Sequence, residues 1–397
     1  MTGMLPSTPF HPNLDSGLRQ SPGIEIVKDG DSVAETQPPS LTTQSQELSR
    51  NSTVKIWMKR STRTAGFIYG PLEHYLDHLA PFCSLMQIPL ILTDEELFKT
   101  AELYYPDLTL LYWNCLEAPF EIVQAFDTLF YSTPRCMFDE IFFIAEATFR
   151  KKMKTIWLPH GNSDKGHASF LMEGLNDEET LLVYGPKMVD FLKTKQIFKP
   201  SISLGNFRLE YYRRHKLFYD ALMEKLPAMK TVLYAPTWQD GENSTSFFMV
   251  ADRLIEQLPS QILLLIKLHP NLEKDVRALQ FKLQHENLPN IRFLTGFTPV
   301  YPILEKTDLY LGDLSSVGYD FLTFNRPMFF FNPTNRDSSD PGLYLHRCGE
   351  TIQPDQLFDS LARDQSHLTP MRQATYAYTF GKQEWALAQQ EILHHLR

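Results

Sequence analysis

Four polar clusters in the sequence have residue types that could do chemistry, and each directly follows a short apolar stretch. The clusters contain His160-Gly161, Thr237, His269 and Ser315-Ser316. Histidine exchanges a proton near neutral pH, whereas hydroxyl groups and a close glycine backbone can hold an anion. A lone histidine after a strand is more often structural. Two of them in opposite halves of the chain, together with the serine pair, favour one shared site.

The serine pair lies within residues 308–322, which read as a buried strand, a tight turn and the start of a helix. Gly312 permits the turn, and Asp313 or Ser315 can cap the helix that follows. Free backbone N–H groups and the helix dipole make a helix N-terminus a good anion site. An ordinary N-cap with an extra serine would explain this stretch equally well on its own.

Several common catalytic motifs are absent from the sequence. It has neither a G-x-x-x-x-G-K-[ST] loop nor a G-x-G-x-x-G fingerprint, which argues against a P-loop NTPase and against a Rossmann dehydrogenase. It has no H-E-x-x-H motif and no acidic cluster, so we expect no catalytic metal and no cofactor. The four cysteines form no C-x-x-C pair, which argues against a cysteine zinc site and indicates reduced thiols.

The elements that must position these clusters are short apolar strands that alternate with helical stretches. In the first half, strands are expected at residues 66–69, 88–92, 108–112, 129–131, 155–158, 181–184 and 202–204. In the second half, they are expected at residues 231–235, 262–267, 291–294, 309–311 and 328–331. This alternation predicts an α/β protein with two doubly wound, Rossmann-like units of parallel sheet. Ligands bind at the carboxyl ends of such strands, so the polar clusters should face one cleft.

The chain is expected to divide into four segments. These are a disordered polar tail at residues 1–50, a Rossmann-like domain at 51–205, a second Rossmann-like domain at 206–370, and a C-terminal helix at 371–397 that packs back across both domains. The tail lacks the apolar surface that would offset the entropy cost of ordering it. A long charged helix at residues 207–225 should bridge the two domains.

Composition and charge restrict the partners of this chain. Its 397 residues carry a net charge of −9, which disfavours non-specific binding to nucleic acid. The sequence begins without a secretory signal pattern and has no apolar run long enough to span a bilayer, so a cytoplasmic chain is expected. A basic stretch could contact a membrane or a phosphate group, although a solvated helix end is the simpler explanation. The stretch consists of Arg150, Lys151, Lys152 and Lys154.

The strand-end residues resemble those of the CDP-glycerol glycerophosphotransferase family, which contains teichoic-acid primases and polymerases. The family pattern reads H-G-x-x-x-K, G-x-P-R, Y-A-P-T-W, an H-P at a strand end, and D-x-S-S-x-x-[FY]-D-F. The matching residues are His160, Gly161, Lys165, Gly205, Arg208, Tyr234 to Trp238, His269, Pro270, Asp313, Ser315, Ser316, Tyr319, Asp320 and Phe321. Two positions depart from the pattern: Phe207 replaces a proline, and Gln239 stands where the family usually has a basic residue.

The resemblance implies a GT-B-like fold in which the second domain holds a nucleotide donor and the first receives the acceptor. It implies transfer of glycerol phosphate from a CDP-linked donor, which is a substrate and not a cofactor, to a hydroxyl of a lipid-linked or polymer acceptor of the cell envelope. His160 would remove the acceptor proton, and a cationic or hydrogen-bond-donating His269 would contact the diphosphate. Donor or phosphate binding is then expected from Gly161, Lys165, Arg208, Thr237, Asp313, Ser315 and Ser316.

Two other interpretations stay open at this point. A GT-B glycosyltransferase or a sugar-nucleotide epimerase with a UDP-linked donor would use the same fold, since fold does not determine chemistry. A catalytically silent binding or effector protein could also keep it. For the leading hypothesis, the expected location is the cytoplasm, or the inner face of the cell membrane as a peripheral protein.

Overall fold

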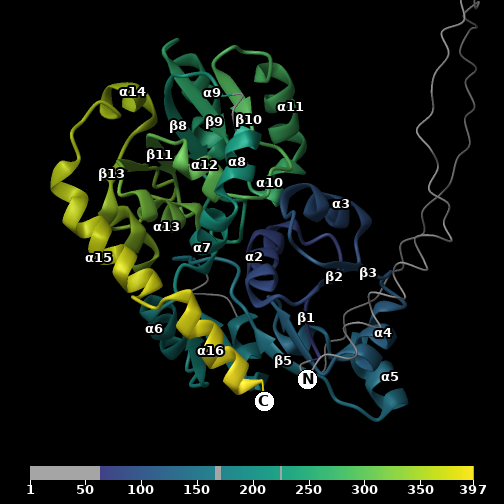
Figure 1. Cartoon of the computed structure of the whole chain (residues 1–397). Coiled ribbons are helices and arrows are strands. Elements are labelled where there is room, and N and C mark those ends of the chain that lie inside the picture. Colours follow the sequence, from purple (N-terminus) through teal and green to yellow (C-terminus); the bar gives the residue numbers. More distant parts are fainter. Residues whose placement is uncertain (1–62, 166–170, 224–225, 397) are drawn as a thin grey trace, which may run out of the picture. The chain divides into compact units, whose positions relative to one another are not determined.

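The computed structural model describes residues 63–165, 171–223 and 226–396, and these belong to one compact unit (Figure 1). Two parallel sheets follow one another along this unit. The predicted polar tail at residues 1–50 lies outside the described residues.

The first sheet has seven parallel strands in the order β3-β2-β1-β4-β5-β6-β7. Its strands are β1 (Thr64–Ile68), β2 (Leu90–Leu92), β3 (Leu110–Tyr112), β4 (Thr128–Tyr131), β5 (Lys154–Trp157), β6 (Thr180–Val183) and β7 (Ser201–Ser203). The connecting helices are α2 (Leu76–Met86), α3 (Glu95–Tyr104), α4 (Ala118–Ala125), α5 (Asp139–Phe149) and α6 (Pro186–Thr194), with the 3-10 turns η1 (Glu73–Tyr75), η2 (Arg135–Met137) and η3 (Leu171–Asp177). Because the chain builds outward on both sides of β1, a switch point for ligand binding lies between β1 and β4.

The second sheet has six parallel strands in the order β10-β9-β8-β11-β12-β13. Its strands are β8 (Lys230–Ala235), β9 (Ile262–Ile266), β10 (Ile291–Phe293), β11 (Leu309–Gly312), β12 (Met328–Phe330) and β13 (Glu350–Thr351). The connecting elements are α9 (Phe247–Glu256), α10 (Pro270–Glu273), α11 (Val276–His285), α12 (Tyr301–Glu305), α13 (Val317–Phe321), η4 (Leu322–Phe324) and η5 (Pro341–Cys348). Here the switch point lies between β8 and β11, so both sheets repeat one plan.

Two helices predicted as continuous are interrupted. The predicted bridge at residues 207–225 consists of α7 (Phe207–Arg214) and α8 (Lys216–Met223), which meet at His215. The ring of His215 contacts the Tyr211 carbonyl and a carboxylate of the first half, Asp107, and this fixes the junction. These two helices therefore join at a point tied to the first half.

The predicted C-terminal helix is also divided. It consists of α15 (Thr369–Phe380) and α16 (Trp385–His395), because Gly381 ends α15 with a φ of +68°. Two shorter segments precede it, η6 (Pro354–Gln356) with α14 (Leu357–Ser360), and η7 (Ser366–Leu368). The helix α15 contacts η5 and α6, whereas α16 contacts β7.

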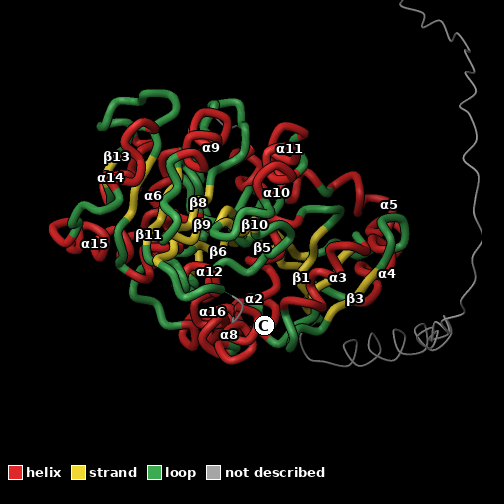
Figure 2. Tube along the Cα trace, turned by 90° about the horizontal axis from the view of Figure 1, so that it is seen from above, coloured by secondary structure: helices red, strands yellow, loops and turns green. Residues whose placement is uncertain are grey.

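The strands are close to continuously apolar because helices cover both faces of each sheet (Figure 2). All five residues of β9 are buried, for example. One apolar cluster extends from Leu79 of the first half, through Phe207 of α7, to Leu233 and Tyr310 of the second half. Since the two sheets share this core, the predicted domain boundary between residues 205 and 206 stays a prediction.

Candidate active site

A cleft of about 810 Å³ lies where the carboxyl ends of strands from both sheets meet. Its walls come from the loops after β1, β4 and β5 on one side, and from those after β8, β9 and β11 on the other. The predicted site residues that line it are His160, Gly161, Lys165, Arg208, Thr237, His269, Ser315 and Ser316. Two doubly wound sheets therefore bring polar residues from both halves of the chain into one cavity.

Three histidine rings lie close together in this cleft, and we call His74, His160 and His269 the histidine cluster. The ring centroid of His74 lies 5.7 Å from that of His160 and 5.9 Å from that of His269. Aromatic neighbours complete the group, because Tyr75 lies 4.7 Å from His160 and Trp238 lies 6.1 Å from His269 between ring centroids. The two predicted histidines thus share a site, and His74 is an additional member.

The histidine cluster is neutral near pH 7. Burial, the neighbouring His74 and the cation of Lys165 lower the pKa of His160 to about 3, although its side chain is open to the cleft. Burial and the same two neighbours lower the pKa of His269 to about 3, and burial lowers that of His74 to about 4. The lowered pKa values favour the neutral form of both rings, so of the two forms predicted for His269 they favour the neutral donor over the cation.

His269 is held as a hydrogen-bond donor toward the cleft. Its Nδ1 accepts a hydrogen bond of 3.1 Å from the backbone N–H of Asn271, at the start of α10. A neutral imidazole that accepts at Nδ1 carries its proton on Nε2. This geometry is compatible with the prediction that His269 is a neutral hydrogen-bond donor.

Gly161 brings the two halves into contact. It has a φ of +126°, and a Cβ at this position would lie 3.1 Å from both Cβ and Oγ of Ser316. Only glycine combines this backbone conformation with so close an approach. The loop after β5 therefore packs directly against the turn after β11 that contains Ser315 and Ser316, which we call the serine turn.

Lys165 reaches from the loop after β5 to the second half. Its Nζ donates to Oγ1 of Thr237 and lies 3.4 Å from the Asp240 carboxylate. Because Thr237 and Lys165 both line the cleft, they place a hydroxyl and a cation side by side. This pair is suited to hold a phosphate oxygen.

Asp313 has a role different from the predicted one. Its buried carboxylate accepts hydrogen bonds from the N–H groups of Thr237 (2.8 Å) and Ser246 (2.7 Å). Burial raises its pKa to about 6. It does not line the cleft and does not cap α13, so the prediction that it binds the donor is wrong. Its carboxylate fixes the loop after β8.

The serine turn also differs from the predicted helix cap. The helix α13 begins after Ser316 without a side-chain cap, and it has only five residues before the 3-10 turn η4. A helix this short adds little dipole to the site. Ser315 and Ser316 nevertheless line the cleft, although Ser315 is buried and lies beside the Tyr310 hydroxyl.

Arg208 also has a structural role. Its guanidinium donates to Asp320 at 2.7 Å, to the carboxylate of Asp77, and to the Asp77 carbonyl at 2.7 Å. All three of its nitrogens are therefore bound within the protein. We correct its predicted phosphate-binding role to that of a buried connection among α2, α7 and α13.

A second buried connection involves Asp164, in the loop after β5. Its carboxylate accepts from the Tyr319 hydroxyl, from the Leu345 N–H at 2.9 Å, and from Lys187 Nζ at 2.8 Å. Tyr319 and Leu345 belong to the second half, whereas Lys187 belongs to α6 of the first half. These contacts fix the loop that carries His160 at Asp164.

Comparison with known proteins gives a family match in the second half. Residues 220–350 match the family model described as CDP-Glycerol:Poly(glycerophosphate) glycerophosphotransferase. Over 141 residues, 35% of this chain and 34% of the relative, the sequence is 26% identical to a teichoic acid glycerol-phosphate primase of Bacillus subtilis (strain 168). Over 233 residues, 51% of this chain and 29% of the relative, it is 24% identical to a teichoic acid poly(glycerol phosphate) polymerase of the same strain.

The resemblance to this glycerophosphotransferase family is confirmed. The matches span about a third or less of the length of these relatives. The family region, residues 220–350, contains Thr237, His269 and the serine turn. His160, Gly161 and Lys165 lie outside it, on the opposite wall of the cleft.

Solved structures with the same fold support the architecture. The wall teichoic acid polymerase TagF aligns with a TM-score of 0.60 at 16% identity, over 89% of this chain and 94% of that chain. A UDP-GlcNAc 2-epimerase from Neisseria meningitidis bound to UDP-GlcNAc aligns with a TM-score of 0.54 at 11% identity, over 84% of this chain and 99% of that chain. At these identities the likeness establishes the fold alone, and the predicted GT-B-like fold is confirmed.

Two further basic residues of the cleft had no role assigned from the sequence. His74 lies in η1, after β1. Lys267 directly follows β9, lines the cleft and donates to the Phe297 carbonyl at 2.7 Å. Both stand at strand ends, so a basic side chain in that position is the sequence signal that points to them.

Two searches of the described residues gave negative results. Residues 63–165, 171–223 and 226–396 contain no group of three or more His, Cys, Asp or Glu side chains that could hold a metal ion. No helix within these ranges combines the length and the apolar character needed to cross a membrane. The absence of a metal or cofactor from the reaction stays a prediction.

Proposed function

We propose that this chain is a transferase that moves a glycerol-phosphate unit, or a related phospho-alditol, from a CDP-linked donor to an acceptor hydroxyl. The observation that carries the proposal is the cleft, in which His160 of one half and His269 of the other share a cavity with a hydroxyl-rich turn. The names of the primase and polymerase relatives support the glycerol-phosphate donor. Synthesis of a cell-envelope polymer would be the corresponding process.

The donor would be held by the second half. Nε2–H of His269, the hydroxyls of Ser315 and Ser316, and the pair formed by Lys165 and Thr237 supply hydrogen-bond donors and a cation for a diphosphate. Preorganised donors of this kind stabilise phosphoryl charge without a proton transfer. Metal-independent binding would follow from this set of groups.

His160 would act as the general base. As the acceptor oxygen forms a bond to the outer phosphorus, the bond from that phosphorus to the CMP oxygen breaks, and the acceptor proton moves to His160. The low pKa of the free histidine would make it a weak base. A bound diphosphate would raise that pKa, because a nearby negative charge favours the protonated ring. Donor binding would thus activate the base.

A panel of nucleotides tests this function. CDP-glycerol, CDP, UDP and a UDP-sugar are added to the full chain, and melting temperature and reaction products are measured. We expect CDP ligands to raise the melting temperature and CMP to be released when an acceptor is present. A response to UDP-sugars alone would favour a glycosyltransferase or an epimerase. No response to any of them would favour a binding protein.

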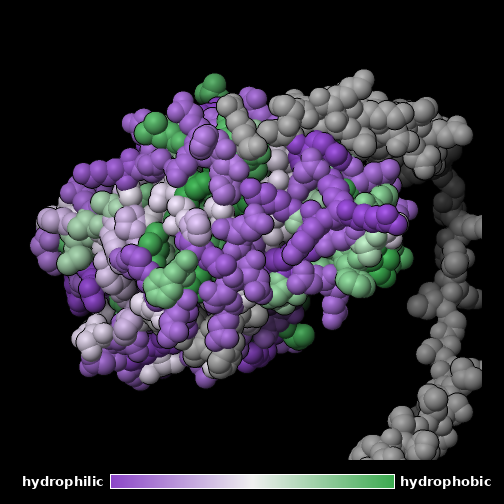
Figure 3. All heavy atoms as spheres, turned by 90° about the horizontal axis from the view of Figure 1, so that it is seen from below, coloured by the Kyte–Doolittle hydropathy of each residue, from purple (hydrophilic) through white to green (hydrophobic). Residues whose placement is uncertain are grey.

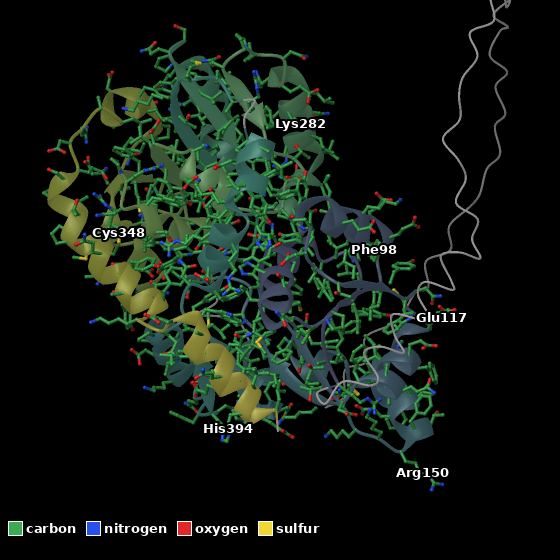
Figure 4. All side chains as sticks on the ribbon, viewed as in Figure 1. Phe98, Glu117, Arg150, Lys282, Cys348 and His394 are labelled. Atoms are coloured by element: carbon green, nitrogen blue, oxygen red, sulfur yellow. The ribbon has the colours of Figure 1, made fainter. Side chains whose placement is uncertain are left out.

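We further propose that the acceptor is presented at a membrane surface, which the face formed by α4 and α5 would contact. Large apolar side chains are exposed there, with Phe143 at 69% and Ile144 at 63%. The others are Leu116, Phe120, Met137 and Phe149. Hydrophobic side chains gather on this side of the face shown in Figure 3, and Arg150 points outward from the end of α5 (Figure 4).

Charge on this face is mixed, because the exposed carboxylates of Glu121 in α4 and Glu140 in α5 accompany the cations at the end of α5. Lys151 donates to the Val123 carbonyl and pairs with Asp127, so its charge is bound within the protein. Arg150 and Lys152 are exposed beside the apolar side chains. The exposed apolar side chains therefore carry the proposed membrane contact, and Arg150 and Lys152 at one end of the face could pair with anionic lipid headgroups.

Vesicle flotation tests the membrane contact. The full chain should float with phosphatidylglycerol vesicles, and Phe143→Ser with Ile144→Ser should abolish flotation while leaving the melting temperature unchanged. Leu279→Ser with Leu283→Ser, on the exposed side of α11, is the matched control. Equal flotation of both double variants would contradict the contact through α4 and α5.

A further inference from the structure

We propose that His74 is a third catalytic residue of this cleft, and that its ring N–H donates a hydrogen bond to the phosphoryl group in transfer. The proposal rests on the proposed function, which assigns an acceptor side and a donor side to the cleft. It names a residue from an element, η1, to which neither the family match nor the sequence motifs gave a role.

Position is the first argument. His74 lies between the two other rings of the histidine cluster, at 5.7 Å from His160 and 5.9 Å from His269 between centroids. A phosphoryl group placed between a donor at His269 and an acceptor at His160 would lie near this ring. The loop after β1 carries it to the switch point of the first sheet, where ligands of such sheets bind.

The free hydrogen-bonding capacity of the ring is the second argument. Within the described part of the chain, the His74 side chain makes ring contacts but no hydrogen bond or ion pair, although it is half-buried. Histidines with structural roles differ from it. His78 lies 2.5 Å from the Tyr184 hydroxyl, and His215 contacts Asp107 and the Tyr211 carbonyl. A half-buried imidazole without a protein partner is suited to a ligand.

The charges around His74 support a neutral donor. The neighbouring charged and titratable groups are His160 of the first half, His269 and Lys274 of the second half, and Glu73 and Asp77 on either side of His74 in the chain. Burial and Lys274 keep the ring uncharged at pH 7 by lowering its pKa to about 4. A neutral imidazole offers one N–H donor. It can bind an anionic oxygen without adding a charge to the empty cleft.

The step can be written with all atoms balanced. The acceptor oxygen–phosphorus bond forms while the phosphorus–oxygen bond to CMP breaks, and the acceptor proton goes to His160. The electron pair of the broken bond leaves on the CMP phosphate. His74 keeps its proton throughout and stabilises the non-bridging oxygens of the phosphorus as charge redistributes across them.

The experiment compares His74→Ala, His74→Gln and the control His367→Gln, which alters an exposed histidine outside the cleft. Turnover with CDP-glycerol is measured, together with calorimetric Kd values for CDP and CMP. We expect His74→Ala to lower kcat by roughly 10²-fold, the scale of a lost charge-stabilising donor, and Gln, whose amide can donate, to restore part of it. CDP binding should weaken more than CMP binding, because CMP lacks the outer phosphate. The control should match the native chain.

Several outcomes would overturn the proposal. Turnover of His74→Ala within about threefold of native would remove the catalytic role, and equal weakening of CDP and CMP would indicate a structural effect. If His74→Ala does not fold, the Kd values of His74→Gln for CDP and CMP decide whether His74 contacts the outer phosphate. A native chain that binds neither CDP nor UDP overturns the proposed function itself. A native chain that turns over CDP-glycerol independently of His74 overturns the role of His74 alone.

Discussion

At the scale of single residues, the proposed chemistry would depend on imidazole rings that are neutral near pH 7. Each ring of the histidine cluster has a lowered pKa because burial and nearby cationic or titratable groups penalise its charged form. A bound diphosphate would reverse the electrostatic part of this effect. The free cleft is therefore a set of hydrogen-bonding groups, and the loaded cleft would hold a proton acceptor.

The two predicted catalytic histidines should respond differently to substitution. We expect His160→Ala to lower kcat by roughly 10²- to 10⁴-fold and to leave the donor Kd nearly unchanged, because the ring would act on the acceptor proton. His269→Ala should weaken donor binding and turnover together. The native kcat/KM should fall only at a pH well below 6.5, where free His160 gains its proton. Near-native turnover of His160→Ala, measured on folded protein, would rule out its role as base.

The serine turn should contribute to donor affinity. Replacing both Ser315 and Ser316 with alanine removes two hydroxyls from the wall of the cleft. We expect donor binding to weaken by about 1–3 kcal/mol, the scale of hydrogen bonds to a charged group. Calorimetry on the double variant measures this, with Ser339→Ala on an exposed loop as the control. An unchanged Kd would show that backbone groups alone form this wall.

At the scale of elements, the strands could be predicted but several side-chain roles could not. Apolar runs such as Ile262–Ile266 stand out because both faces of the sheet are covered, and polar residues after them are recognisable as strand ends. Whether a polar side chain can bind a ligand or instead bonds to another protein group depends on which element, distant in the sequence, lies opposite it. The Arg208–Asp320 pair joins residues 112 positions apart, so no local pattern indicates it.

The buried position of Arg208 has a measurable consequence. Arg208→Ala would leave the carboxylates of Asp77 and Asp320 without their cation, and we expect a loss of about 3–5 kcal/mol in the free energy of unfolding. Arg214→Ala is a matched control on the same helix, because its pair with Glu210 is exposed and should contribute about 1 kcal/mol or less. Denaturant titration separates the two. Similar losses would mean that Arg208 is not a central connection.

At the scale of the whole molecule, the sheets share one core, and stability should depend on pH through the histidines whose pKa values are lowered. The pKa values of His74 and His346 are lowered to about 4, those of His160 and His269 to about 3, and that of His78 well below its usual value. Between pH 6.5 and pH 4, the unfolded chain therefore binds more protons than the folded one. Stability is highest above this window and falls as the pH decreases through it.

Denaturant titrations between pH 7.5 and pH 5 test this dependence. Carboxyl groups whose pKa values are raised by burial oppose this trend, because they bind protons more readily in the folded chain; they are Asp313, Glu178, Glu273 and Asp320. His346→Phe should reduce the slope, since His346 is buried and stacks on Phe330 at 4.4 Å, whereas His367→Gln, an exposed change, should not. A stability that rises as the solution is acidified would contradict the assignment of neutral buried histidines.

At Gly161, the backbone of one half lies within one methyl group of Ser316 in the other half. A Gly161→Ala chain would keep every side chain assigned to the reaction. The added methyl group would clash with Ser316 and push apart the loop that carries His160 and the turn that would bind the nucleotide. Such a chain would recognise its nucleotide through the second half and fail to align the base with it. Under the proposed function, a single carbon atom at Gly161 would separate nucleotide recognition from chemistry.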